Sequence, residues 1–88
     1  MKFVIHYTLA PAHRDAAQRR FASTGGGPPA GVTMTARYHC AQGHEGFVIC
    51  ETNDAASLAR WMQDWTDLLE FRTLPVVDDQ TLASIIGG

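Results

Sequence analysis

Residues 34–52 have the sequence MTARYHCAQGHEGFVICET, and this stretch decides the fold. Two runs in which apolar and polar residues alternate flank the turn-forming residues 42–44, a pattern typical of a β-hairpin. A hairpin centred on Gly43 pairs His39 with Phe47, Arg37 with Ile49 and Thr35 with Glu51. This centre of pairing fixes which side chains share a face of the sheet.

The two faces of this hairpin are expected to differ in chemistry. Successive side chains of a strand point to opposite faces. With the pairing above, Arg37, His39 and Glu51 share one face. The other face carries Tyr38, Cys40, Val48 and Cys50 and is mostly apolar. We therefore predict one polar face that is equipped for chemistry and one apolar face that packs into the core.

Length and charge restrict the classes of protein to which the chain can belong. Its 88 residues make one small domain, spanning residues 1–88, and its net charge of −2 argues against a nucleic-acid partner or an anionic membrane surface. No stretch approaches the ~20 apolar residues of a membrane helix. The first residues, MKFVIHYTL, resemble a strand rather than a signal peptide, so we expect a cytoplasmic protein whose two cysteines are thiols.

The remaining sequence supplies two strands and three helices around the hairpin. Residues 2–9 and 70–77 have the composition of strands, and residues 12–23, 55–69 and 79–86 have helical patterns. The order β-α-β-β-α-β with a short C-terminal helix predicts the ferredoxin-like α+β fold, an antiparallel sheet with its helices on one face. The open face then needs water or a partner, and a homodimer is the partner we expect.

A glycine-rich segment, GGGPPAG at residues 25–31, joins the first helix to the hairpin. A phosphate-binding P-loop would have the pattern G-x-x-x-x-G-K-[ST] and would lie between a strand and a helix. Here the glycines follow a helix, precede a strand and have no lysine nearby. We therefore interpret the segment as a connector.

Several segments together resemble the bacterial family called domain of unknown function 3303. They are KFVIHYTL, TGGGPPAGVTMTARYH, GFVICETND and WMQDWTDLLEFRTLPVVDD, and they cover nearly the whole chain. The resemblance implies a ferredoxin-like subunit of the dimeric α+β barrel type, in which two sheets close on each other. Proteins of that type include cofactor-free oxygenases, lactone isomerases and dye- or haem-degrading enzymes, and also members without known chemistry.

The candidate site is the polar face of the sheet, where a homodimer would enclose a cavity. Its ligand-binding residues are His6, Arg37, His39 and Glu51, and the ligand is a small anionic or aromatic organic molecule. In a cofactor-free enzyme, His39 is the candidate acid or base and Arg37 the anion clamp, because imidazole titrates near neutral pH and guanidinium matches a carboxylate. Alternatively, these groups pair with one another in a non-catalytic interaction or regulatory module.

Neither a metal nor a cofactor is predicted. His6, His39 and Glu51 have the composition of a facial triad, so a metal-binding protein remains a second alternative, although no close spacing supports it. Cys40 and Cys50 are expected on the apolar face, about four ladder positions or ~13 Å apart, which is too far for a disulfide. Buried there, both would behave as small apolar side chains.

Overall fold

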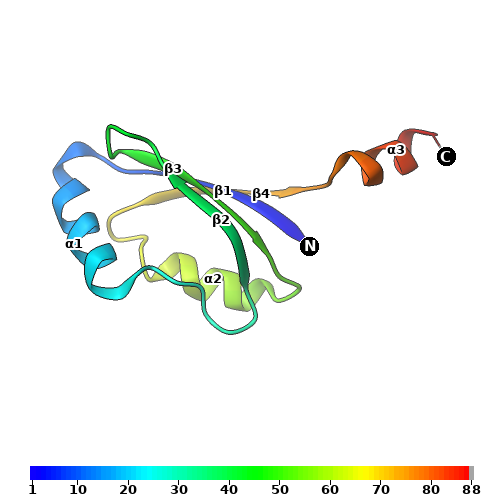
Figure 1. Ribbon diagram of the computed structural model, residues 1–88. Helices are drawn as coiled ribbons and strands as arrows, with labels where there is room; N and C mark the ends of the chain where they lie inside the picture. Colours follow the sequence, from blue (N-terminus) through cyan, green and yellow to red (C-terminus); the bar gives the residue numbers. More distant parts are fainter. Residues whose placement is uncertain (88) are drawn as a thin grey trace.

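The computed structural model describes residues 1–87 and has a sheet with helices against one of its faces (Figure 1). The elements are β1 (Lys2–Thr8), the 3-10 turn η1 (Pro11–His13), α1 (Arg14–Thr24), β2 (Thr33–His39), β3 (Glu45–Glu51), α2 (Ala55–Gln63), β4 (Glu70–Val76) and α3 (Asp79–Gly87). The strand order is β2-β3-β1-β4, and all neighbouring strands are antiparallel. The predicted ferredoxin-like α+β fold is confirmed.

The second helix is shorter than its apolar pattern predicts. Asp54 caps its N-terminus, because the carboxylate accepts a hydrogen bond from the Ala56 amide at 3.0 Å, and the helix ends at Gln63. Beyond it the chain continues in tight turns, in which Trp65 donates to the Met62 carbonyl at 3.0 Å. The periodic apolar residues after Gln63 therefore lie in a turn segment and do not continue the helix.

The core lies between the sheet and α2. Six buried residues form it: Ile5, Val32, Val48, Cys50, Leu58 and Trp61. The first helix contributes little, since Ala17 is its one buried residue. The core thus holds α2 firmly against the sheet, and space remains between the sheet and α1.

The register of the hairpin differs from the prediction by one residue. Cys40 donates to the Glu45 carbonyl at 2.9 Å, so a loop of residues 41–44 closes the hairpin, and its centre lies half a residue before Gly43. Arg37 consequently pairs with Val48, and His39 pairs with Gly46. Because the side-chain period of a strand is two, this small shift moves the polar residues of β2 to the opposite face.

The predicted division of the faces is therefore wrong for β2 and right for β3. Arg37 and His39 lie on the helix-covered face with Val48 and Cys50, whereas Tyr38 lies on the open face. An irregularity in the ladder between Met34 and Ala36 returns Met34 to the core. The open face is consequently more apolar than predicted, and it exposes Tyr38, Phe47 and Leu74.

The C-terminal helix α3 stands away from the rest of the molecule at the end of an extended segment (Figure 1). It has no buried residue, and the side chains of Ile85 and Ile86 are 66% and 77% exposed. These residues form an exposed apolar surface on α3. No helix within residues 1–87 combines the length and the apolar character needed to cross a membrane.

Candidate functional site

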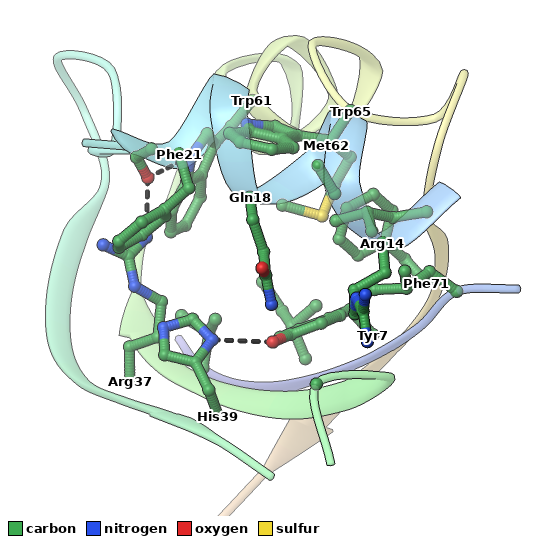
Figure 2. A pocket seen from close by; sticks show the side chains of 17 residues that line it. Tyr7, Arg14, Gln18, Phe21, Arg37, His39, Trp61, Met62, Trp65 and Phe71 are labelled. Atoms are coloured by element: carbon green, nitrogen blue, oxygen red, sulfur yellow. Dashed lines mark hydrogen bonds between the residues drawn. The ribbon is translucent and has the colours of Figure 1, made fainter. Parts of the chain in front are cut away.

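A pocket of about 290 Å³ lies between the helix-covered face of the sheet and the two helices α1 and α2 (Figure 2). Seventeen residues line it: Ile5, Tyr7, Leu9, Arg14, Ala17, Gln18, Phe21, Gly26, Arg37, His39, Gly43, Val48, Trp61, Met62, Trp65, Leu69 and Phe71. They come from every strand, from both covering helices and from four of the segments that connect these elements. The pocket is thus a product of the whole fold rather than of one motif.

The two sides of the pocket differ in polarity. Trp61, Met62 and Trp65 form an apolar wall on the helix side, and Tyr7 and His39 face them from the sheet (Figure 2). Gln18 of α1 projects between the two sides (Figure 2). A flat, mostly apolar molecule with one polar edge would fit between these walls with that edge towards the sheet side.

Tyr7 and His39 form the shortest hydrogen bond in the pocket, 2.6 Å between the phenolic oxygen and Nδ1 (Figure 2). They come from β1 and β2, which are separated in the sheet by β3. The Tyr7 ring therefore crosses over β3, and it does so at Gly46. A Cβ atom at position 46 would overlap both the Tyr7 ring and the backbone carbonyl of Tyr38, so glycine at this position allows the contact between Tyr7 and His39.

Arg37 binds the glycine-rich connector. Its Nη1 donates to the Gly26 carbonyl at 2.7 Å, its Nη2 donates to the Gly25 carbonyl at 2.9 Å, and its guanidinium lies 4.8 Å from the centre of the Phe21 ring. The Gly26 carbonyl also accepts from Trp61 Nε1 at 3.3 Å. The connector thus presents carbonyl oxygens to a cation, which is the opposite of the amide donors that a phosphate loop presents to an anion.

A second arginine attaches α1 to the turn segment after α2. Arg20 makes two bonds of 2.7 Å to the carboxylate of Asp67 and one of 2.8 Å to the Asp64 carbonyl. Its guanidinium also lies 5.4 Å from the centre of the Trp65 ring. These contacts hold the outer wall of the pocket together although α1 buries little apolar surface.

The surroundings of the polar groups shift three pKa values. Partial burial raises the pKa of Tyr7, and the neighbouring Cys40 raises it further, against a lowering by Arg37. Partial burial and the charge of Arg37 both lower the pKa of His39. Burial also lowers the pKa of Arg37. At neutral pH the pocket therefore contains a protonated phenol, a neutral imidazole and a guanidinium cation.

The structure brings together two of the four predicted site residues. Arg37 and His39 line the pocket, but on the helix-covered face, and the open-face position predicted for them is wrong because of the hairpin register. His6 lies on the open face, where it contacts Glu45 at 3.0 Å and stacks on Phe47. Glu51 is exposed and lies four residues from the partner of His6 along β3, ~13 Å away at ~3.3 Å per residue.

The facial triad of His6, His39 and Glu51 is wrong for the same reason, since His39 lies on the opposite face from the other two. Within residues 1–87 no three histidine, cysteine or acidic side chains are close enough to hold a metal ion. Cys50 is fully buried as predicted, and burial raises its pKa. Cys40 instead lies half-buried beyond the end of β2, so its predicted place in the core is wrong.

Sequence reasoning missed Tyr7 and Gly46, and it did not include Trp61 and Trp65 among the candidate ligand-binding residues. Tyr7 was visible as a polar-tipped aromatic residue on the core-facing side of β1, where a hydroxyl needs a partner. Gly46 was visible as a glycine inside a strand, which commonly marks a close approach of another group. Neither signal names the partner, because Tyr7 and His39 are 32 residues apart in the sequence.

Comparison with known proteins agrees with this architecture. The family model for domain of unknown function 3303 (DUF3303) matches residues 1–88, and the chain belongs to that family. No match was found among curated proteins. The structure is similar to that of Rv0793 from Mycobacterium tuberculosis, with a TM-score of 0.50, 16% identity and coverage of 89% of this chain and 96% of that one. It is also similar to a proposed antibiotic biosynthesis monooxygenase from Deinococcus radiodurans, with a TM-score of 0.47, 6% identity and coverage of 89% and 94%. At these identities the likeness concerns the fold.

Proposed function

We propose that this member of the DUF3303 family binds one small, flat organic molecule, aromatic or anionic, in the pocket between the sheet and the helices. The observation that supports this most is the apolar wall of Trp61 and Trp65 opposite the polar groups of Tyr7, Arg37 and His39. Ligand pockets commonly combine apolar walls with a few converging polar groups. A volume of about 290 Å³ is near the lower limit for such pockets and suits one or two fused rings.

Tryptophan fluorescence offers a direct test, because both tryptophans of the chain line the pocket. We expect a two-ring probe such as 2-naphthol to change their emission in a saturable way. Ala17→Leu, which adds volume at a buried position of α1 facing the pocket, should weaken binding at least tenfold. Ala22→Leu is the matched control, since it makes the same change at an exposed position of the same helix.

Two outcomes would contradict this proposal. One is that neither 2-naphthol nor other one- and two-ring aromatic compounds bind the wild-type protein. The other is that Ala17→Leu, folded by circular dichroism, binds the probe as tightly as wild type. In either case the remaining candidate is the non-catalytic interaction module, which needs no ligand.

We also propose that the protein is a homodimer joined through the open face of the sheet. This face exposes 67% of Tyr38 and 41% of Phe47, and the helices cover only the other face. A small domain gains stability by burying such a surface, and a specific dimer buries on the order of 1,000 Å² or more. The apolar residues of α3 add a second surface that a partner can cover.

Sedimentation tests the dimer. The wild-type protein should sediment as a dimer at micromolar concentration, and Phe47→Asp should shift it to a monomer because a carboxylate would be buried without a partner. Ser23→Asp, on the exposed surface of α1, should leave the dimer intact. A wild-type monomer, or a Phe47→Asp variant that remains dimeric, would contradict the interface.

A cytoplasmic location completes the proposal. Cys40 and Cys50 are both free, and thiols persist in a reducing compartment. Fractionation of cells that produce the protein would test this directly, and recovery in the periplasmic or secreted fraction would contradict it.

A further inference from the structure

The two terminal nitrogens of Arg37 are already committed. Each donates to a carbonyl oxygen of the glycine-rich connector, at 2.7 and 2.9 Å. The end edge of the guanidinium, between these two nitrogens, is one of the edges that can bind a carboxylate with two parallel bonds, and here it binds the backbone. Arg37 therefore contributes to the pocket a positive charge that its bonds to the connector hold in a fixed position.

That charge has no acidic partner within the pocket. None of the seventeen described lining residues is Asp or Glu, and the carbonyls that bind Arg37 are neutral. Arg14, the other lining cation, is bonded to Asp15 at 3.0 Å. A cation among apolar walls and without a counter-ion favours a negative charge on whatever occupies the pocket.

A proton acceptor lies on the same face as Arg37, two residues further along β2. His39 has a neutral imidazole that is bonded to the hydroxyl of Tyr7 at 2.6 Å. The groups that face this pair are Arg37 from β2, Arg14 from α1 and the thiol of Cys40 beyond β2. The pocket thus combines an uncharged base, a hydroxyl that can relay a proton and a nearby fixed cation.

We infer that the pocket takes up a phenol or a stabilised enol, rather than a carboxylic acid, and holds it as its oxyanion, with the proton passing to the Tyr7–His39 pair. This inference rests on the proposed function and names the ligand class of that site. The O–H bond of the ligand breaks and an N–H bond forms on His39, either directly or through the Tyr7 hydroxyl. The negative charge stays on the ligand oxygen near Arg37, and no oxidant or cofactor takes part.

The ionisation can be followed with 4-nitrophenol, because its anion absorbs visible light and its neutral form does not. At a mildly acidic pH, where the free probe is mostly neutral, the wild-type protein should produce the phenolate band in proportion to bound probe. NMR should show the His39 ring becoming protonated on binding. With 4-nitroanisole, which has no proton to give, His39 should stay neutral.

Variants separate the charge from the base. Arg37→Met should lower the ratio of bound phenolate to bound neutral phenol at least tenfold, and Arg37→Lys should restore part of it because the charge returns. His39→Gln should abolish the NMR change and reduce the phenolate band. Arg19→Met, on the exposed surface of α1, is the control for removing an arginine and should match wild type. Should Arg37→Met fail to fold, Arg37→Lys and His39→Gln still decide the question.

Equilibrium dialysis shows whether each probe binds, which distinguishes the two proposals. If 4-nitrophenol binds but remains neutral, or if 4-nitrobenzoate binds more tightly than 4-nitrophenol, the inference is overturned and the proposed function stands. If 2-naphthol binds but neither 4-nitrophenol nor its methyl ether does, the inference fails and the proposed function stands. If none of the three compounds binds, both proposals fail.

Discussion

Replacing Arg37 by Met should destabilise the protein by about 2 kcal/mol, because Arg37 joins β2 to the glycine-rich connector. A hydrogen bond from a charged group contributes about 1.5–3 kcal/mol when it is buried. In the variant, water can replace Arg37 at the exposed Gly25 carbonyl, and the Gly26 carbonyl keeps its bond from Trp61. The two hydrogen bonds of Arg37 together therefore contribute about 1–1.5 kcal/mol to the free energy of unfolding. The contact with Phe21 adds about 0.5–1 kcal/mol.

Urea unfolding at one fixed protein concentration measures this loss, because the stability of a dimer depends on its concentration. For a domain of this size, about 2 kcal/mol lowers the melting temperature by roughly 8–16 °C. Arg19→Met serves as the control, since Arg19 is exposed and has no side-chain hydrogen bond within residues 1–87. Equal urea midpoints for the two variants would refute the claim that Arg37 holds the connector.

Three further predictions follow from the pocket and the core. Gly46→Ala should displace the Tyr7 ring and break its bond to His39, which NMR of the His39 ring would detect, and an unchanged His39 spectrum would contradict this. A thiol reagent should modify the half-buried Cys40 in the native protein and reach the buried Cys50 only after denaturation. Rapid modification of Cys50 in the native protein would show that its position in the core is wrong. The pKa of His39 is lower in the folded protein than its ordinary value of about 6.5, so the unfolded chain takes up this proton first and stability should fall as the pH drops below about 6.5 towards the folded pKa. His39→Gln should reduce this loss between pH 7 and 5, and an unchanged pH profile would count against it.

The order of the elements could be predicted from the sequence because each depends on local features. Apolar periodicity marks the strands and helices, Pro11 and Asp54 mark helix starts, and the glycine-rich segment marks a connector. Errors at this level were confined to ends, as where the second helix stops at Gln63. Local pattern also placed Val48 and Cys50 correctly in the core.

The site could not be predicted to the same degree because it depends on the register of the hairpin. The sequence of the turn is compatible with a centre at Gly43 or half a residue earlier, and only the Cys40–Glu45 closure selects the second. Hydrophobic pattern does not decide between them, since β2 carries few large apolar side chains. A half-residue difference in the centre of the turn therefore puts the side chains of Arg37 and His39 on the opposite face of the sheet from the one predicted.

The glycine-rich connector shows why a motif has to be interpreted by its partners. Its composition alone is compatible with anion binding, but in the structure the carbonyls of Gly25 and Gly26 accept hydrogen bonds from Arg37. Gly25 and Gly26 have φ angles of 75° and 56°, which L side chains rarely adopt, and this backbone turns both carbonyls towards the guanidinium. The polarity of the loop follows from the residue at position 37, and that residue faces the loop only in the register that the hairpin adopts. One hairpin closure thus determines both the chemistry of the pocket and the role of the connector.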